Sequence, residues 1–309
     1  VVVGDGGGGA GAETLRLIQS DQIPVMTVVI APSGNLDMNG QSDTIGSLTL
    51  QRIKNLAPTI NTTGLTIDTL NLNNVGATDD TTMAAVINGT LGLTAVRNFN
   101  IDDALRIGSG DDLVINAVIG GAGGGITKNG FGTLVLTGNN TYTGATTVST
   151  GVFTDGITRL GGSLIIRGDG DIAQSSSVTV NVGASLILDN RLGLALDAAG
   201  RIGNSAGITL AGGELVHIGH ATLAVIELVG SITINAAGTT AGGGTSLIRS
   251  IWNGANVELT GVNLARVAGG TVQFVAEGAD LGGAANRVRF TGTMANISGT
   301  RTLNWATLD

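Results

Sequence analysis

A short phrase that recurs along the chain constrains its fold more than any other feature. Each copy is a glycine, one or two small residues, and then apolar residues that alternate with polar or small ones. The alternation places Leu, Ile or Val on one face of a strand and Thr, Ser or Asn on the other, and glycine permits the positive φ of a corner. Copies begin at Gly34, Gly46, Gly64, Gly132, Gly162, Gly230 and Gly270.

Strands this short cannot bury an apolar face alone, so they must stack on one another. The copies are separated by about a dozen to three dozen residues, which favours coils interrupted by loops over a strict repeat. Coils stacked about 4.8 Å apart would join every strand to neighbours above and below and would build one continuous core. We therefore expect an all-β fold, a right-handed parallel β-helix (β-solenoid) with Gly/Asn-rich corners and loops over residues 13–309, preceded by a flexible Gly-rich linker over residues 1–12.

A sandwich, a jelly roll and a propeller are the competing all-β architectures, and each requires hairpins. Four Asn-Gly pairs have the sequence of two-residue hairpin turns: Asn39-Gly40, Asn88-Gly89, Asn129-Gly130 and Asn253-Gly254. Only 3% of the residues are aromatic, whereas sandwich cores and propeller blades depend on aromatic side chains. The composition therefore favours the β-helix.

Charge and composition exclude several classes of partner. The net charge is −8 and the chain has only two lysines, Lys54 and Lys128, so it offers no basic surface for nucleic acid or anionic lipid. No apolar run approaches the roughly 20 residues of a membrane span. The absence of cysteine excludes a disulfide scaffold and thiolate metal sites. The chain opens at Val1 without a signal segment, so we expect a piece of a longer product.

One segment combines these features over about thirty residues. Residues 123–153 read GGGITKNGFGTLVLTGNNTYTGATTVSTGVF, in which Gly130 and Gly132 can turn the chain tightly and Asn140 can bond its own backbone at a corner. Tyr142, the only tyrosine, is expected to cap the end of a coil with its ring and not to bind a sugar.

This segment closely resembles the autotransporter-associated β-strand repeat. The pattern of that family is an apolar-Thr-Lys-x-Gly-x-Gly opening, a Thr-Leu-x-Leu strand and a Gly-x-Asn-Thr-Tyr-x-Gly-x-Thr corner. The resemblance implies a passenger-type β-helix, secreted by a Gram-negative-type bacterium and displayed on its surface. The positions that match the pattern are Lys128, Gly130, Gly132, Leu134, Leu136, Asn140, Tyr142, Gly144 and Thr146.

The strongest candidate for a catalytic cluster is acidic. Its members are Asp102, Asp103, Arg106, Asp111 and Asp112. Paired carboxylates can serve as acid and base in glycoside hydrolysis, but the sequence shows no aromatic platform for a sugar and no lysine near the cluster. Since aspartate is a common turn residue, we interpret these residues as turns and expect no catalytic residue.

Two fragments, Gly108 to Asp111 and Gly168 to Asp171, are similar to parts of Gly-rich calcium-binding repeats. They make Asp111, Asp112, Asp169 and Asp171 weak calcium candidates. Such repeats need several consecutive copies, and each fragment stands alone, so no metal site or cofactor is expected.

Two other short motifs have structural interpretations. The tripeptide Arg167-Gly168-Asp169 matches the one that animal integrins bind, but we expect a strand end followed by a turn. His217 and His220 are three residues apart and cannot share a strand face, so a two-histidine metal site is not expected.

These features together predict a structural or adhesive segment of a large secreted cell-surface protein. A carbohydrate-active β-helix enzyme (a polysaccharide lyase or hydrolase) and a stalk that presents another domain are the alternatives. The expected partners are surface glycans or other cells, with no nucleic acid and no membrane insertion.

Both ends of the chain read as strands without a polar cap, in residues 14–18 and 303–308. We therefore expect each end to be covered by more of the same chain or by another copy stacked end to end into a fibre. With roughly 20 to 25 residues per coil, the rod would have about a dozen layers and a length of about 60 Å.

Overall fold

The computed structural model describes residues 1–53, 55–75, 83–103, 110–150, 161–195, 200–235 and 245–292, and the strand at 306–308. The described residues form strands and turns and contain no helix, so none could cross a membrane as a helix. The strands are β1 (Val2–Val3), β2 (Glu13–Arg16), β3 (Thr27–Ile30), β4 (Gly34–Asp37), β5 (Asp43–Arg52), β6 (Thr59–Asn74), β7 (Ala85–Gly92), β8 (Val96–Ile101), β9 (Leu113–Ile115), β10 (Val118–Gly120), β11 (Gly125–Asn129), β12 (Leu134–Leu136), β13 (Thr146–Val148), β14 (Ser163–Arg167), β15 (Ser177–Asn181), β16 (Ser185–Asp189), β17 (Gly207–Ala211), β18 (Glu214–Ile218), β19 (Val225–Val229), β20 (Ile232–Ile234), β21 (Ser246–Ile251), β22 (Val257–Gly261), β23 (Leu264–Arg266), β24 (Val272–Glu277), β25 (Asn286–Phe290) and β26 (Ala306–Leu308).

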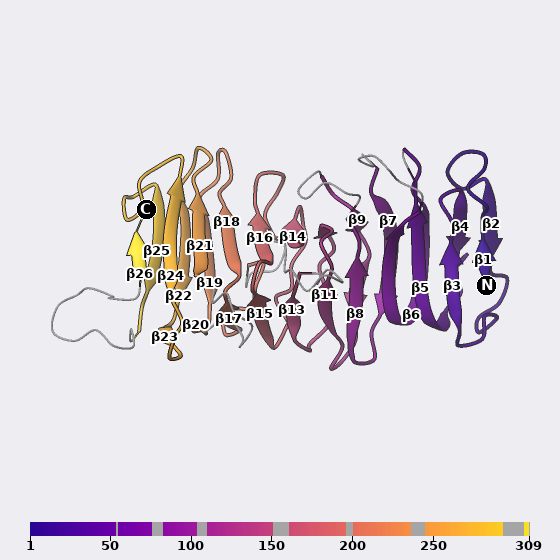
Figure 1. The fold of residues 1–309 in the computed structure, drawn as a ribbon, viewed down its shortest axis with the longest axis horizontal. Coiled ribbons are helices and arrows are strands. Elements are labelled where there is room, and N and C mark those ends of the chain that lie inside the picture. The colour runs from indigo at the N-terminus through magenta and orange to yellow at the C-terminus, as the bar shows by residue number, and fades with distance from the viewer. Residues whose placement is uncertain are drawn as a thin grey trace.

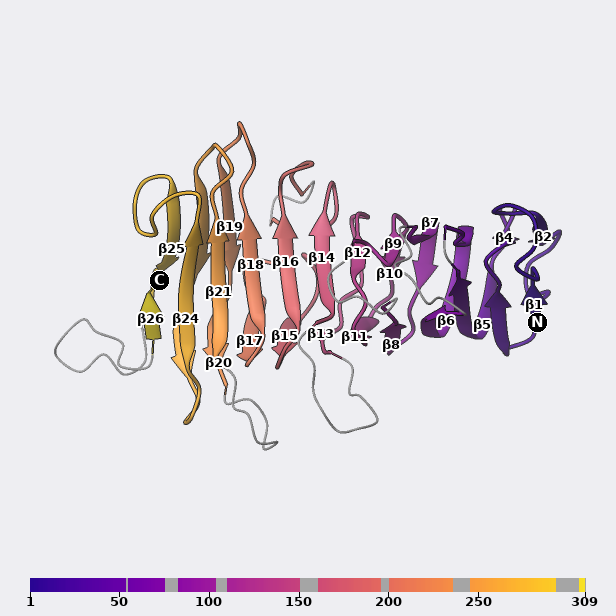
Figure 2. The ribbon, with the colours of Figure 1, turned by 45° about the horizontal axis from the view of Figure 1, so that its top comes forward.

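The strands stack into a parallel β-helix with three faces, which confirms the predicted fold class. Every pairing between two named strands is parallel. The coils follow one another along the long axis, with the two termini at opposite ends (Figure 1; Figure 2).

Face A contains β1, β3, β8, β11, β13, β15, β17, β20 and β23, together with the later parts of β5 and β6. Face B contains β2, β4, β9, β12, β14, β16, β18, β21, β24 and β26, together with the first parts of β6 and β7. Face C contains parts of β5, β6 and β7 with β10, and further along the rod the separate sheet β19-β22-β25. Between these two parts of face C, isolated bridges join Asn139 to Asp171 and Ile172 to Ile202.

The Asn-Gly pairs turn the chain from one face to the next, so the hairpin interpretation is wrong. Asn39 (φ 49°) and Gly40 (φ 80°) link β4 on face B to β5 on face C. Gly89, Gly130 and Gly254 likewise have φ values of 96°, 88° and 119°. A sharp corner needs positive φ as much as a hairpin does. The strand that follows each corner pairs with a strand of the preceding coil, whereas in a hairpin it would pair with the strand directly before the turn.

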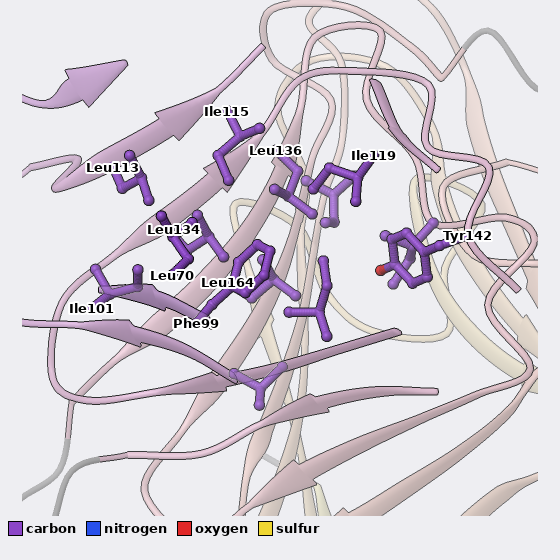
Figure 3. Packing of buried hydrophobic residues seen from close by; sticks show 14 of the residues in the cluster. Leu70, Phe99, Ile101, Leu113, Ile115, Ile119, Leu134, Leu136, Tyr142 and Leu164 are labelled. Carbon is purple, nitrogen blue, oxygen red and sulfur yellow. The ribbon is translucent and has the colours of Figure 1, made fainter. Parts of the chain in front are cut away.

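Inward side chains stack in columns, because strands that pair in register place like positions over one another. On face B, Leu134 lies between Leu113 and Leu164, and Leu186 follows in the next coil. All of these residues are completely buried. Figure 3 shows Leu134 and Leu164 packed with other side chains of this core, among them Phe99 from face A.

The predicted alternation of apolar and polar residues holds for most positions of face A but is wrong for the middle of face B. There the outward column is also aliphatic, with Val114, Val135, Ile165 and Ile187 in successive coils. Val135 has no exposed surface. A strand that is apolar in both directions is typical of a sheet covered on both sides.

Two finer expectations need adjustment. Coils vary more in length than predicted, since 20 residues separate Lys128 from Val148 but 32 separate Val148 from Val180 in register. The segment predicted as a linker begins with a strand, in which Val3 is buried and pairs with Ile30. The flexible linker therefore stays a prediction only for residues 4–12.

The leucine column on face B yields a direct test of the core. Leu164→Ala should lower the free energy of unfolding by roughly 2–5 kcal/mol, because it leaves a cavity between two stacked leucines. Thr179→Ala, an outward change on face A, should alter it by less than about 0.5 kcal/mol. Urea unfolding followed by circular dichroism measures both changes. Equal losses of unfolding free energy would contradict the assignment of Leu164 as inward and Thr179 as outward.

Candidate functional site

The motif lysine points into the core. In β11 the side chains of Ile126 and Lys128 point inward, and the Lys128 side chain is completely buried. Its Nζ donates a hydrogen bond to the carbonyl oxygen of Gly130 at 2.6 Å. A Cβ on Gly162, in the next coil, would lie 2.7 Å from Nζ. The lysine therefore occupies space between faces A and B that a larger residue at Gly162 would fill.

Lys128 joins a buried charged cluster that also contains Arg52 and Asp112. Asp112 forms an ion pair with the Arg52 guanidinium and accepts a hydrogen bond from the Thr133 amide at 2.6 Å. Burial raises the pKa of Asp112, against the opposing effects of Arg52 and Lys128. Burial also lowers the pKa of Lys128 to about 7, although Asp112 and Asp103 act in the opposite direction.

The expectation that no lysine lies near the acidic residues at 102–112 is wrong. The fold brings Lys128 to them from the next coil. Arg52, Asp112 and Lys128 are 0%, 4% and 0% exposed, so a polymeric substrate could not reach them. Arg106, the remaining cation of the predicted cluster, lies outside the described residues.

The second half of the motif ties three coils together. The Asn140 Oδ1 atom accepts a hydrogen bond from the Ile119 amide at 2.9 Å, and its Nδ2 atom donates to the carbonyl oxygens of Gly138 and Asp171, both at 2.8 Å. The side chain thus serves its own turn, as expected, and also the coils before and after it. The Asn140 side chain thereby supplies hydrogen bonds to backbone groups where the sheet of face C is interrupted.

Tyr142 lies inside the corner and does not cap the end of a coil. It is 1% exposed, and its hydroxyl group is 2.7 Å from the Thr146 Oγ1 atom, which in turn is 3.0 Å from the Ser175 Oγ atom. Burial raises the pKa of Tyr142 well above its ordinary range. The ring cannot serve as an open platform for a sugar.

A further buried polar corner was missed at the sequence level. Arg201 is 1% exposed and donates hydrogen bonds to the carbonyl oxygens of Gly168, Gly170 and Gly193 at 2.6–3.0 Å. The Glu227 carboxylate accepts hydrogen bonds from the amides of Arg201 and Ile202 at 3.1 and 2.7 Å, and burial raises its pKa to about 7.

These two residues lie at the base of a pocket of about 230 Å³ whose wall includes Asn190, Ile226 and Leu228. Arg201 also donates to the Asn190 Oδ1 atom at 2.8 Å. Since the charged groups at the base are engaged with the backbone of neighbouring coils, they hold a corner together.

The two histidines do not meet. His217 is completely buried in β18 with no hydrogen-bond partner for either ring nitrogen within the described residues, and burial lowers its pKa to about 3. His220 accepts hydrogen bonds from the amides of Thr222 and Leu223 at its Nδ1 atom, both at 3.1 Å.

The four aspartates named as calcium candidates do not converge. Asp111 binds Arg167 and Asp112 binds Arg52, so two of the carboxylates are already neutralised by guanidinium groups. Asp171 is buried and accepts a hydrogen bond from the Ala173 amide at 3.2 Å, while Asp169 is exposed. Within the described ranges no group of three or more His, Cys, Asp or Glu residues could hold a metal ion.

The integrin-like tripeptide is partly engaged within the protein. Arg167 ends β14 and donates a hydrogen bond to the Asp111 Oδ2 atom at 2.6 Å, and Gly168 turns the chain with a φ of 62°. Arg167 would have to break this ion pair before it could bind another protein.

Comparison with known proteins identifies the motif. Residues 126–154 match the family model described as passenger-associated-transport-repeat. The chain carries an autotransporter passenger repeat. The repeat includes every motif position from Lys128 to Thr146, and it comprises β11, β12 and β13 in the middle of the coil stack.

A relative shares a longer stretch. The chain is 40% identical over 89 residues to the adhesin BmaC autotransporter of Brucella suis biovar 1 (strain 1330). The matched stretch is 29% of this chain and spans about 2% of the length of that relative. No solved structure matches the chain significantly.

Two glycines of the passenger repeat region form a matched pair for testing the corner geometry. Gly130 has a φ of 88°, and a Cβ there would lie 2.3 Å from the carbonyl oxygen of Ile101 in the preceding coil. Gly123 has a φ of 73° but faces open space. Gly123→Ala should cost about 1 kcal/mol for its left-handed backbone, whereas Gly130→Ala should lower the free energy of unfolding by more than about 2 kcal/mol because two coils must also separate. Urea unfolding of both variants measures the difference, and equal losses would show that close coil packing at Gly130 is unimportant.

The buried lysine predicts a pH dependence of stability. Between pH 7 and 10 the unfolded chain binds a proton at Lys128 that the folded protein does not, so stability should rise with pH by about 1.4 kcal/mol per unit in this window. Lys128→Met should remove that rise. Since the chain has no cysteine and a single, buried tyrosine, few other groups titrate there. Denaturant unfolding at several pH values provides the measurement, and an unchanged slope in Lys128→Met would contradict the buried amine.

Proposed function

We propose that this chain is a segment of a secreted bacterial surface passenger and that its outer faces mediate adhesion. One observation carries the proposal: the passenger repeat is continuous with the rest of the rod. Its strand β11 pairs with β8 before it, and its strands β13 and β12 pair with β15 and β14 after it. The similarity to an autotransporter adhesin supports the adhesive role.

The placement of the charged residues supports a non-enzymatic role. Asp112 is paired with Arg52 inside the rod, Asp111 is paired with Arg167, and the Tyr142 ring is buried. A polysaccharide lyase or hydrolase needs such groups on an accessible surface.

The partners would be surface glycans, other cells, and further coils at each end of the rod. At the N-terminal end, β1 pairs with β3 and β2 with β4, and each has no strand on its other edge among the described residues. Another coil of a longer chain, or a second copy stacked end to end, would satisfy these edges.

Adhesion that rests on hydrogen bonding and shape should depend little on salt. Fluorescent beads that carry the purified chain should be retained on cell monolayers well above albumin-coated beads. Retention should change by less than about twofold between low and physiological salt, because screening acts on charges. A tenfold fall would show that electrostatics carries the adhesion, and retention no greater than that of albumin would contradict the adhesive role.

A further inference from the structure

Face A presents an ordered column of hydroxyl groups. Each paired coil contributes one outward residue in register, and nearly all of these residues are threonine or serine. The hydroxyls of Thr147, Thr179 and Thr209 form no hydrogen bond with any described residue of the protein. In coil order the column is Thr27, Ser47, Thr69, Asn98, Thr127, Thr147, Thr179, Thr209 and Thr233.

A second outward column lies two residues further along the same strands and consists mainly of amides. Asn100 donates a hydrogen bond to Asn71 at 2.8 Å, and Asn129 donates to Asn100 at 3.1 Å. Asn71 in turn donates to Thr49 at 3.3 Å. Asn129 also donates to Asn98 at 3.4 Å. Each side chain in this ladder is held by its neighbours, yet Asn71 and Asn100 each keep a second N–H group, and each amide oxygen keeps a further acceptor lone pair for a ligand.

The outward positions of face A are uncharged along most of the rod. From β3 to β20, the described outward residues of the face A strands include no Asp, Glu, Lys or Arg. Arg97 of β8 lies in the inward phase and pairs with Asp68 at the edge of the face.

The other surface ion pairs of the described residues include two clusters on faces B and C. Arg249 binds Glu214 and Glu277 on face B, and Glu258 binds Arg287 and Arg289 on face C. In a chain with a net charge of −8, a neutral face of this length is a distinct surface.

We propose that face A is a binding surface for a neutral, extended polysaccharide that lies along the rod. Charge matching favours an uncharged ligand, and the hydroxyl and amide columns supply the donors and acceptors that sugar hydroxyls need. A coil advances by about 4.8 Å, which is close to the length of one sugar unit in an extended β-linked chain. The proposal rests on the adhesive function proposed above and names its ligand class and its surface.

The chemistry of face A also predicts how the ligand binds. Among the described residues of its strands, face A has no outward aromatic ring on which a single sugar could stack, so each contact is a weak, solvent-exposed hydrogen bond. Many such contacts made by one polymer add up through multivalency. Binding should therefore require a long chain, and a monosaccharide should not compete.

Pull-down of the purified chain with insoluble cellulose and chitin tests this proposal. The informative variant is Thr147→Lys with Thr209→Lys, which places charges in alternate coils of face A. The matched control is Asn256→Lys with Val262→Lys, two exposed positions beside strands of face C. Melting temperature and circular dichroism establish that both variants are folded.

We expect the unmodified chain and the control to bind at least one of these polymers in the presence of excess glucose, and the face A variant to bind at least tenfold more weakly. Failure of the unmodified chain to bind either polymer, or equal binding by the face A variant, would overturn the proposal. Bead retention on cells measured in parallel separates the two claims, since retention without polysaccharide binding leaves the adhesive function standing.

Discussion

The in-register hydrogen bonding of each coil to the next is the interaction on which this structure depends. Parallel pairing repeats every backbone bond along the rod and places each side chain over its counterpart in the coil before. The inward residues of successive strands form a column in the core, such as the one through Leu134 and Leu164 on face B. On face A the outward residues form a column on the surface, such as the one through Thr147 and Thr179. A short strand that could not fold alone thereby gains two neighbours and a shared core.

Where the ladder is interrupted, buried polar side chains take over its role. Asn140, Arg201 and Glu227 each bind backbone groups of neighbouring coils at corners of the rod. Asp112 does the same between faces A and B, where it accepts a hydrogen bond from the Thr133 amide. An unpaired backbone group at such a corner would be costly. The charged side chains inside the rod are therefore explained by their structural role.

The strands, the parallel stacking and the passenger repeat could be predicted from the sequence, because alternation and glycine corners are local patterns. The same alternation could have predicted that two charged residues point inward. Arg52 follows the inward residues Leu48 and Leu50 at the same spacing, and Glu227 lies between the inward residues Val225 and Val229. Their partners could not be predicted. Coils differ in length, so a single sequence does not show which strands stack, and the pairing of Arg52 with Asp112 across 60 residues depends on that stacking.

Distances between spin labels on face A test the stacking most directly. The chain has no cysteine, so cysteines introduced at Thr27, Thr127 and Thr233 can be labelled in pairs and measured by double electron–electron resonance. Thr27 and Thr127 are four coils apart in register, as are Thr127 and Thr233. At about 4.8 Å per coil, continuous stacking predicts about 19 Å for each of these pairs and about 38 Å between Thr27 and Thr233. Unequal distances for the two four-coil pairs, or an outer distance well short of their sum, would contradict the continuous stack.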